Sequence, residues 1–351
     1  MESCDQLFDA AQRKRLERHD LWDRVTSNGT ISAAVMVLAA IAAVVCANTA
    51  AYEPIHHFLE QELFVGLGSL TAGLTVEVFV NDFLMAIFFL LVGIELKYEM
   101  TVGELTNPRQ AMLPMLAAVG GVVVPACIYA FLNKGGAIHG WAIPMATDIA
   151  FALGILALLG NRVPAGVRVF LSTLAVADDI IAILVIAIFY GQSPSPAWLL
   201  AAGVVLAVLV AMNRGHVYSL LPYMLVGALL WYCVYMSGVR STIAGVLLAF
   251  AIPSGSRVNL RTFATWSDSK VREANRAFDP EEPVLAQGRY METVRHLSHV
   301  ARQVVPPATR LEHKLYPWVY FGILPLFALT NADVSLVGTA FGDVVSSPIF
   351  L

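Results

Sequence analysis

Long apolar segments alternate with short polar ones along most of the chain. Nine of these segments are candidate spans, for which a helix needs roughly 20 residues, and polar or Gly/Pro-marked breaks separate them. The eighth is short and depends on packing rather than on length. A tenth begins at residue 336 and contains Asp343. The pattern predicts an all-α polytopic membrane protein. The nine runs are residues 31–48, 79–95, 111–132, 141–159, 169–190, 197–212, 218–236, 241–252 and 317–331.

The same pattern divides the chain into four parts. Residues 1–30 form a charged tail, residues 31–252 hold eight runs, and residues 317–351 hold the ninth and the start of the tenth. Residues 253–316 have the composition of a soluble segment, which predicts a solvated linker or a regulatory insertion. Its second half shows helical spacing, which predicts one amphipathic helix. The spaced apolar residues are Val294, Leu297, Ala301 and Val304.

Composition supports the membrane assignment and excludes several classes of protein. Hydrophobic residues make up 58% of the 351 residues, charged residues make up 14%, and the mean hydropathy is +0.68, which excludes a soluble enzyme. The basic residues follow the ends of the apolar runs and form no nucleic-acid patch, and no Gly-rich nucleotide motif follows a strand. The four cysteines are scattered without metal-binding spacing. We therefore expect lipid as the surroundings, no nucleic-acid partner and no resident cofactor.

Basic residues also predict the orientation. With a cytoplasmic amino terminus and alternating runs, ten Lys and Arg lie in short inner segments, and only Lys134 and Arg240 lie outside. A cleaved signal peptide ending near residues 47–50 is the alternative, and the long charged tail before the first run counts against it. The ten inner residues are Arg13, Lys14, Arg15, Arg18, Arg24, Lys97, Arg109, Arg162, Arg168 and Arg214.

Three aspartates lie inside apolar runs. Asp178 and Asp179 are adjacent in the fifth run, and Asp148 lies in the fourth. A carboxylate at bilayer depth costs roughly 2.5 to 3.5 kcal/mol on insertion scales, so such residues indicate a pathway for cations or protons. Neighbouring carboxylates hold protons more tightly, and their oxygens are ligands for the hard cations Na+ and Li+. Competition between a proton and a cation at one site is sufficient for exchange; a helix cap is the alternative.

The geometry of these residues suggests separate roles. Adjacent residues on a helix project about 100° apart, so one of Asp178 and Asp179 lines the ion site and the other lies beside it. In the fourth run, Pro144 removes a backbone donor, and Thr147 and Asp148 can bond backbone groups locally. We expect the helix to be interrupted there, with Asp148 offsetting a positive half-helix end; a buried cap is the alternative.

Further acids lie near the predicted membrane edges. Asp82 stands at the outer end of the second run, where it either faces a funnel or caps the helix. Glu95 and Lys97 stand at its inner end, where interface anchoring is the default expectation. His313 follows Glu312 before the ninth run, and this pair could report cytoplasmic pH or simply form a charged edge.

Four stretches of this sequence resemble the NhaA family of bacterial sodium/proton antiporters. The second includes Ala146-Thr147-Asp148-Ile149-Ala150-Phe151, and the third surrounds Asp178 and Asp179. The resemblance covers nearly the whole chain apart from the insertion. The four stretches are residues 81–93, 140–161, 174–190 and 310–334.

The resemblance implies an inverted-repeat antiporter fold in the bacterial inner membrane, with a broken fourth helix crossing a second broken helix. It implies that Asp178 and Asp179 bind the ion and proton, with Asp179 the sodium ligand, and that Asp148 lies at the crossing. Glu95 and Glu312 match acids of the pH response, and Asp82 matches a funnel aspartate. It further implies a homodimer formed through a β-hairpin at residues 64–76.

The chain also departs from the family pattern. Tyr98 stands where relatives commonly have arginine, and Arg240 stands where a histidine is known. Relatives continue with three further spans, which carry the second broken helix and a membrane lysine. The sequence as given does not include these spans, so an incomplete or inactive antiporter is one alternative to the function below.

The residues and the resemblance together predict electrogenic exchange of Na+ or Li+ for protons, which exports sodium and regulates cytoplasmic pH. An uncoupled cation channel or another sodium-coupled carrier is a second alternative. An intramembrane aspartyl protease also needs two acids in different spans, but it should show a Gly-x-Gly-Asp run. Here Asp178 follows Val176 and Ala177, so we expect no enzyme activity.

Overall fold

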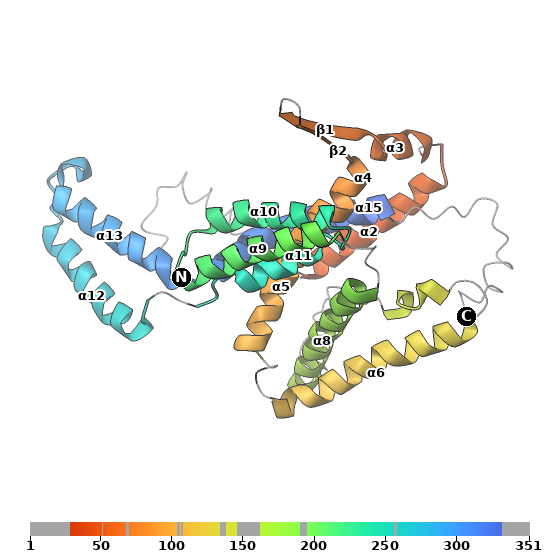
Figure 1. The fold of residues 1–351 in the computed structure, drawn as a ribbon. Helices are drawn as coiled ribbons and strands as arrows, with labels where there is room; N and C mark the ends of the chain where they lie inside the picture. The colour runs from red at the N-terminus through yellow and green to blue at the C-terminus, as the bar shows by residue number, and fades with distance from the viewer. Residues whose placement is uncertain are drawn as a thin grey trace.

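The computed structural model of the chain consists of helices and one two-stranded hairpin (Figure 1). The all-α class is therefore confirmed, with the hairpin as its one departure within the described residues. The interruption expected at Thr147 and Asp148 and the tenth run lie outside these residues. The structure describes residues 29–50, 52–67, 70–103, 106, 108–133, 138–145, 162–189, 195–255 and 258–331.

A long helix lies at the centre of the larger helical bundle. It begins as α4 (Val76–Val78), continues through the π-helical η1 (Phe79–Leu84) and ends as α5 (Met85–Thr101). The side chain of Thr75 caps its start by accepting a hydrogen bond from the backbone N–H of Val78 at 3.2 Å. A capped start suits a helix whose first backbone donors have no partner within the helix.

The larger bundle also includes α9 (Pro196–Arg214), α10 (Leu220–Met236) and α11 (Ile243–Ala251). Helices α9 and α10 pack on each other and on α11, and α11 packs extensively on α5. Glycines allow this approach, because a Cβ at Gly93 would lie 2.7 Å from the Cβ of Ala249. The core of the bundle is formed by fully buried side chains, among them Leu209, Tyr223, Leu230 and Ile252.

The ninth predicted run lies in a helix that begins ten residues earlier than expected. The helix consists of α14 (Pro307–Trp318), the π-helical η7 (Val319–Ile323) and α15 (Leu324–Asn331), and α15 packs against α2 (Gly29–Ala47). Pro317 was read as the start of the run but lies inside the helix. The π-helical turn directly after it accommodates the backbone irregularity that an internal proline causes.

A second unit is formed by α6 (Pro108–Leu132) and α8 (Ala165–Phe189), which lie side by side (Figure 1). Two short 3₁₀ helices, η3 (Ile138–Gly140) and η4 (Ile143–Met145), pack on α6. We call these four elements the α6–α8 unit.

Two kinds of hairpin extend from the helices (Figure 1). After α3 (Tyr52–Leu59), strands β1 (Glu62–Leu67) and β2 (Leu70–Thr75) pair antiparallel in the region where the resemblance implied a β-hairpin. The second is helical and consists of α12 (Leu260–Ala277) and α13 (Gly288–Val304), with the 3₁₀ helix η6 (Val284–Ala286) in the connection. The amphipathic pattern predicted α13 and missed α12.

Helices occupy eight of the nine predicted apolar runs, the fourth run being described only as far as Met145. Within the described part of the chain, three helices are long and apolar enough to cross a membrane unaided. The helix at Leu220–Met236 is apolar but shorter. The three long helices are Val76–Thr101, Met112–Leu132 and Pro196–Arg214.

Candidate functional site

Asp178 lies half-buried on α8, on the side that packs within the α6–α8 unit. Ile181 and Val185 follow it at positions i+3 and i+7, so all three residues share one helix face. Ile181 and Val185 pack against a small core that contains Val122 and Met145. The Asp178 face of α8 is therefore turned toward α6 and toward the end of η4.

The segment before Thr147 is not α-helical. Its described part consists of turns and 3₁₀ helices, and the ring of Trp141 contacts Phe189 of α8 edge to face at a centroid distance of 5.2 Å. Met145, at the end of η4, is buried against α6 and α8. Thr147 and Asp148 follow by two and three residues and lie outside the described residues, as does the side chain of Asp179. Their positions in the site stay predictions.

A second group of acids lies at the end of α5. Glu95 of α5 lies within electrostatic range of the hydroxyl of Tyr316 on α14, and the two helices pack against each other. Glu312 lies half-buried one turn before Tyr316, and His313 is exposed. Burial raises the pKa of the Glu312 carboxyl, and the nearby His313 partly opposes this shift. The structure thus brings Glu95 and Glu312 to one pair of helices, separate from the α6–α8 unit that holds Asp178.

Asp82 lies toward the opposite end of the same long helix, about 20 Å from Glu95 at 1.5 Å per residue. Its Oδ1 accepts a hydrogen bond from Ser241 Oγ at 2.5 Å, and its backbone oxygen accepts one from Trp231 Nε1 at 3.3 Å. These bonds tie the π-helical η1 to α10 and to the residues just before α11. A structural role for Asp82 is therefore visible, while its place in a funnel stays a prediction.

Sequence reasoning missed a cluster of donors at the carboxyl end of α11. Lys97 Nζ donates to the carbonyl oxygens of Phe250 at 2.8 Å and Ile252 at 2.5 Å. Asn213 Nδ2 donates to the oxygen of Ala251 at 2.7 Å. The last carbonyls of a helix lack partners within the helix and carry partial negative charge, so a lysine suits this place. Lys97 caps α11, a contact that spacing along one chain does not reveal.

The described residues contain no group of three or more His, Cys, Asp or Glu that could hold a metal ion. The side chains of Asp179 and Asp148, two of the three acids expected around the transported cation, lie outside the described part of the chain. We expect sodium as a transported substrate, and a substrate ion does not need the permanent ligands of a resident metal centre.

Long apolar helices, together with the half-buried Asp178 on α8, define a polytopic membrane protein of the ion-carrier class. The chain belongs to the family described as Na+/H+ antiporter 1, which matches it over residues 23–351.

Curated relatives agree with this membership. The Na(+)/H(+) antiporter NhaA of Oleidesulfovibrio alaskensis is 42% identical over 306 residues, which are 87% of this chain and 68% of the relative. The NhaA protein of Pseudomonas fluorescens is 44% identical over 309 residues, covering 88% of this chain and 67% of the relative. The NhaA protein of Syntrophobacter fumaroxidans is 42% identical over 334 residues, covering 93% and 69%. The NhaA resemblance read from the sequence is confirmed.

Proposed function

We propose that this protein exchanges sodium or lithium for protons across the bacterial inner membrane, exporting the cation electrogenically and so regulating cytoplasmic pH and sodium. Family membership and relatives named Na+/H+ antiporters support this function. The structural observation that carries it is the place of Asp178. Its helix face is turned to the 3₁₀ helix η4, which comes shortly before Thr147 and Asp148 in the chain.

In the proposed site, Asp178 and Asp179 hold either protons or a dehydrated cation. Asp179 is the sodium ligand, Asp178 lies beside it, and Thr147 and Asp148 complete the polar surroundings. Carboxylate and hydroxyl oxygens are the ligands that hard cations prefer. A proton that binds a carboxylate neutralises its negative charge, so the carboxylate no longer attracts the cation. Binding of one ion therefore excludes the other.

Alternating access around this site requires two bodies that can move relative to each other. The α6–α8 unit carries Asp178, and the larger bundle carries the acids Glu95 and Glu312, each with its own core. Rocking of one repeat or bundle against another is the usual route to alternating access in secondary transporters. We assign the moving transport element to the α6–α8 unit.

Glu95, Glu312 and His313 form the proposed pH-responsive entrance on the cytoplasmic side, and Asp82 lies in the outer funnel. The orientation rests on the excess of basic residues in the inner segments, which also places the amino terminus in the cytoplasm. The β1–β2 hairpin is the proposed surface of a homodimer.

Everted membrane vesicles test the exchange. A proton gradient is formed, and NaCl or LiCl is added while a fluorescent dye reports the gradient. We expect either salt to dissipate the gradient, and Asp179→Asn to abolish this effect. Asp268→Asn, on the exposed helix α12, serves as the matched control and should leave exchange intact. Sodium flux without proton movement would show an uncoupled channel, and substantial exchange by Asp179→Asn would remove that residue from the site.

A further inference from the structure

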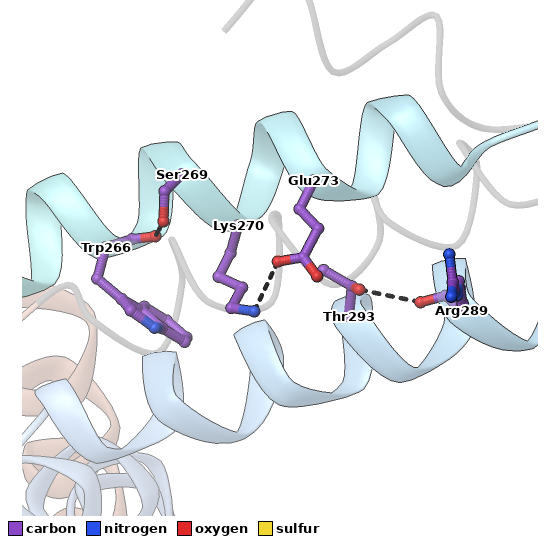
Figure 2. A network of polar contacts seen from close by, with 6 residues as sticks. All are labelled: Trp266, Ser269, Lys270, Glu273, Arg289 and Thr293. Atoms are coloured by element: carbon purple, nitrogen blue, oxygen red, sulfur yellow. Dashed lines mark hydrogen bonds and ion pairs between the residues drawn. The ribbon is translucent and has the colours of Figure 1, made fainter.

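The hairpin of α12 and α13 contains a polar groove between its two helices, with a volume of about 970 Å³. Figure 2 shows the two helices with some of the lining side chains. No part of the proposed transport mechanism uses this groove. Four cations and two carboxylates line it, which leaves a net charge of +2 with histidine neutral. The cations are Lys270, Arg272, Arg276 and Arg289, and the carboxylates are Glu273 and Glu292.

Two of the four cations are already neutralised. Lys270 Nζ pairs with Glu273 Oε2 at 2.6 Å, as Figure 2 shows, and Arg272 pairs with Asp268 at 2.5 Å. The hydrogen bond from Lys270 lowers the pKa of Glu273, so this carboxylate stays charged at neutral pH. The groove therefore has no spare carboxylate on α12 for a further cation.

The other two cations form no salt bridge among the described residues, although Arg289 lies within electrostatic range of Glu273. Arg276 lies in the last turn of α12 and Arg289 lies near the start of α13, so both flank the same end of the groove. Both side chains are exposed and free to adjust. Like charges that face one groove repel each other, and an anion bound between them removes this repulsion.

We propose that this groove binds a phosphate-bearing anion between Arg276 and Arg289. A guanidinium donates two parallel hydrogen bonds to phosphate oxygens, and two guanidinium groups suit the two phosphates of a diphosphate. With Lys270 and Arg272 already paired, Arg276 and Arg289 are the cations left to face the anion. Glu292 lines the same groove, and its carboxylate repels the anion, which lowers the affinity.

The position of the groove favours a soluble ligand. The hairpin projects away from the larger bundle (Figure 1), and its two ends meet where the backbone N–H of Ala308 donates to the oxygen of Pro253 at 3.3 Å. Phospholipid headgroups also carry phosphate groups, so they are the second possible source of the bound anion. Binding at the groove does not depend on the proposed ion exchange, so either can fail alone.

Binding of inorganic pyrophosphate to the purified full chain tests the proposal. Calorimetry is done in phosphatidylcholine nanodiscs at low salt, because screening weakens exposed charge pairs. We expect saturable binding that Arg276→Gln and Arg289→Gln each weaken about tenfold, the loss expected for one charge-assisted bidentate contact. Glu292→Gln should strengthen it. Arg295→Gln, on α13 but outside the groove lining, is the control and should bind as the unchanged protein does.

Two results would overturn the assignment. One is the absence of saturable binding, and the other is an equal loss in Arg295→Gln, which would show general charge attraction. Nanodiscs with about one third phosphatidylglycerol then separate the sources. Headgroups that occupy the groove would weaken pyrophosphate binding in the unchanged protein, whereas unaltered affinity would assign the groove to a soluble anion.

Discussion

At the scale of single residues, Glu312 shows how burial sets the charge of a carboxyl group. Because burial raises its pKa, Glu312 keeps its proton at a pH where exposed glutamates have lost theirs. The folded protein thus binds this proton more tightly than the unfolded chain. The stabilisation from this proton is fully present below the unfolded pKa and is lost as pH rises through the raised folded pKa.

We therefore predict that Glu312→Gln stabilises the fold at pH values above the folded pKa and leaves stability unchanged in acid. If Glu312 belongs to the pH response, the pH of half-maximal exchange also shifts. Melting temperature and vesicle exchange are measured across a pH series, with exposed Glu281→Gln as the control. Identical profiles for Glu312→Gln and the unchanged protein would exclude a role in sensing.

The contribution of Lys97 to stability depends on two partners, Phe250 and Ile252, which lie 153 and 155 positions away in the chain. Lys97→Met keeps most of the aliphatic stem but leaves the oxygens of Phe250 and Ile252 without their donor. We expect a loss of about 3 kcal/mol, because a hydrogen bond to a charged group contributes roughly 1.5 to 3 kcal/mol. Thermal unfolding in detergent measures this loss of stability, with exposed Lys314→Met as the control. Equal melting temperatures of Lys97→Met and the unchanged protein would show that the cap does not stabilise the fold.

At the scale of elements, the contact of α5 with α11 depends on glycine. A Cβ at Gly245 would overlap the backbone oxygen of Ala86, and backbone atoms cannot move aside as a side chain can. Gly245→Ala should therefore separate the helices and cost about 3 kcal/mol or more. Gly203→Ala on α9 is the control, because its Cβ meets no atom within 4 Å and alanine favours a helix. Thermal unfolding of both variants decides the point, and equal stability of the two would contradict the packing described here.

The apolar runs predicted most of the helices because the length and period of a hydrophobic stretch depend only on neighbouring residues in the sequence. The same dependence on neighbouring residues explains the error at Pro317. The sequence pattern predicts a start at Pro317, although a π-helical turn lets the helix continue through this residue. Helix α12 was missed although its apolar residues also recur at helical spacing, as Leu260, Phe263 and Ala274 do. It is stabilised by the ring contact of Trp266 with His296 at 5.5 Å, a partner that only the folded hairpin supplies.

The candidate site was predictable in part for the same reason. A carboxylate inside an apolar run is visible in the sequence, so Asp178 could be named in advance. Its direction toward η4 could not, because it depends on the packing of Met145 with Ile181 and Val185. The caps provided by Lys97 and Asn213 likewise join residues far apart in the chain.

At the scale of the whole molecule, the α12–α13 hairpin is an appendage of the larger bundle. Its ends are joined by the hydrogen bond from Ala308 to Pro253, so a short link can replace it without moving α11 or α14. We predict that replacing residues 256–305 with a few Gly and Ser residues preserves exchange within about threefold, since long surface insertions change stability little. Vesicle exchange measures it. Complete loss of exchange in a folded variant would make the hairpin part of the transport mechanism.

In the proposed mechanism, sodium and protons compete for the carboxylates on α8. The most direct test is the apparent sodium affinity of the full chain in proteoliposomes, measured from sodium-driven proton flux at a series of pH values. We expect a sodium affinity that weakens by up to about tenfold for each unit of acidification, as competition for one site by one proton requires. A sodium affinity that stays constant across the series would contradict it.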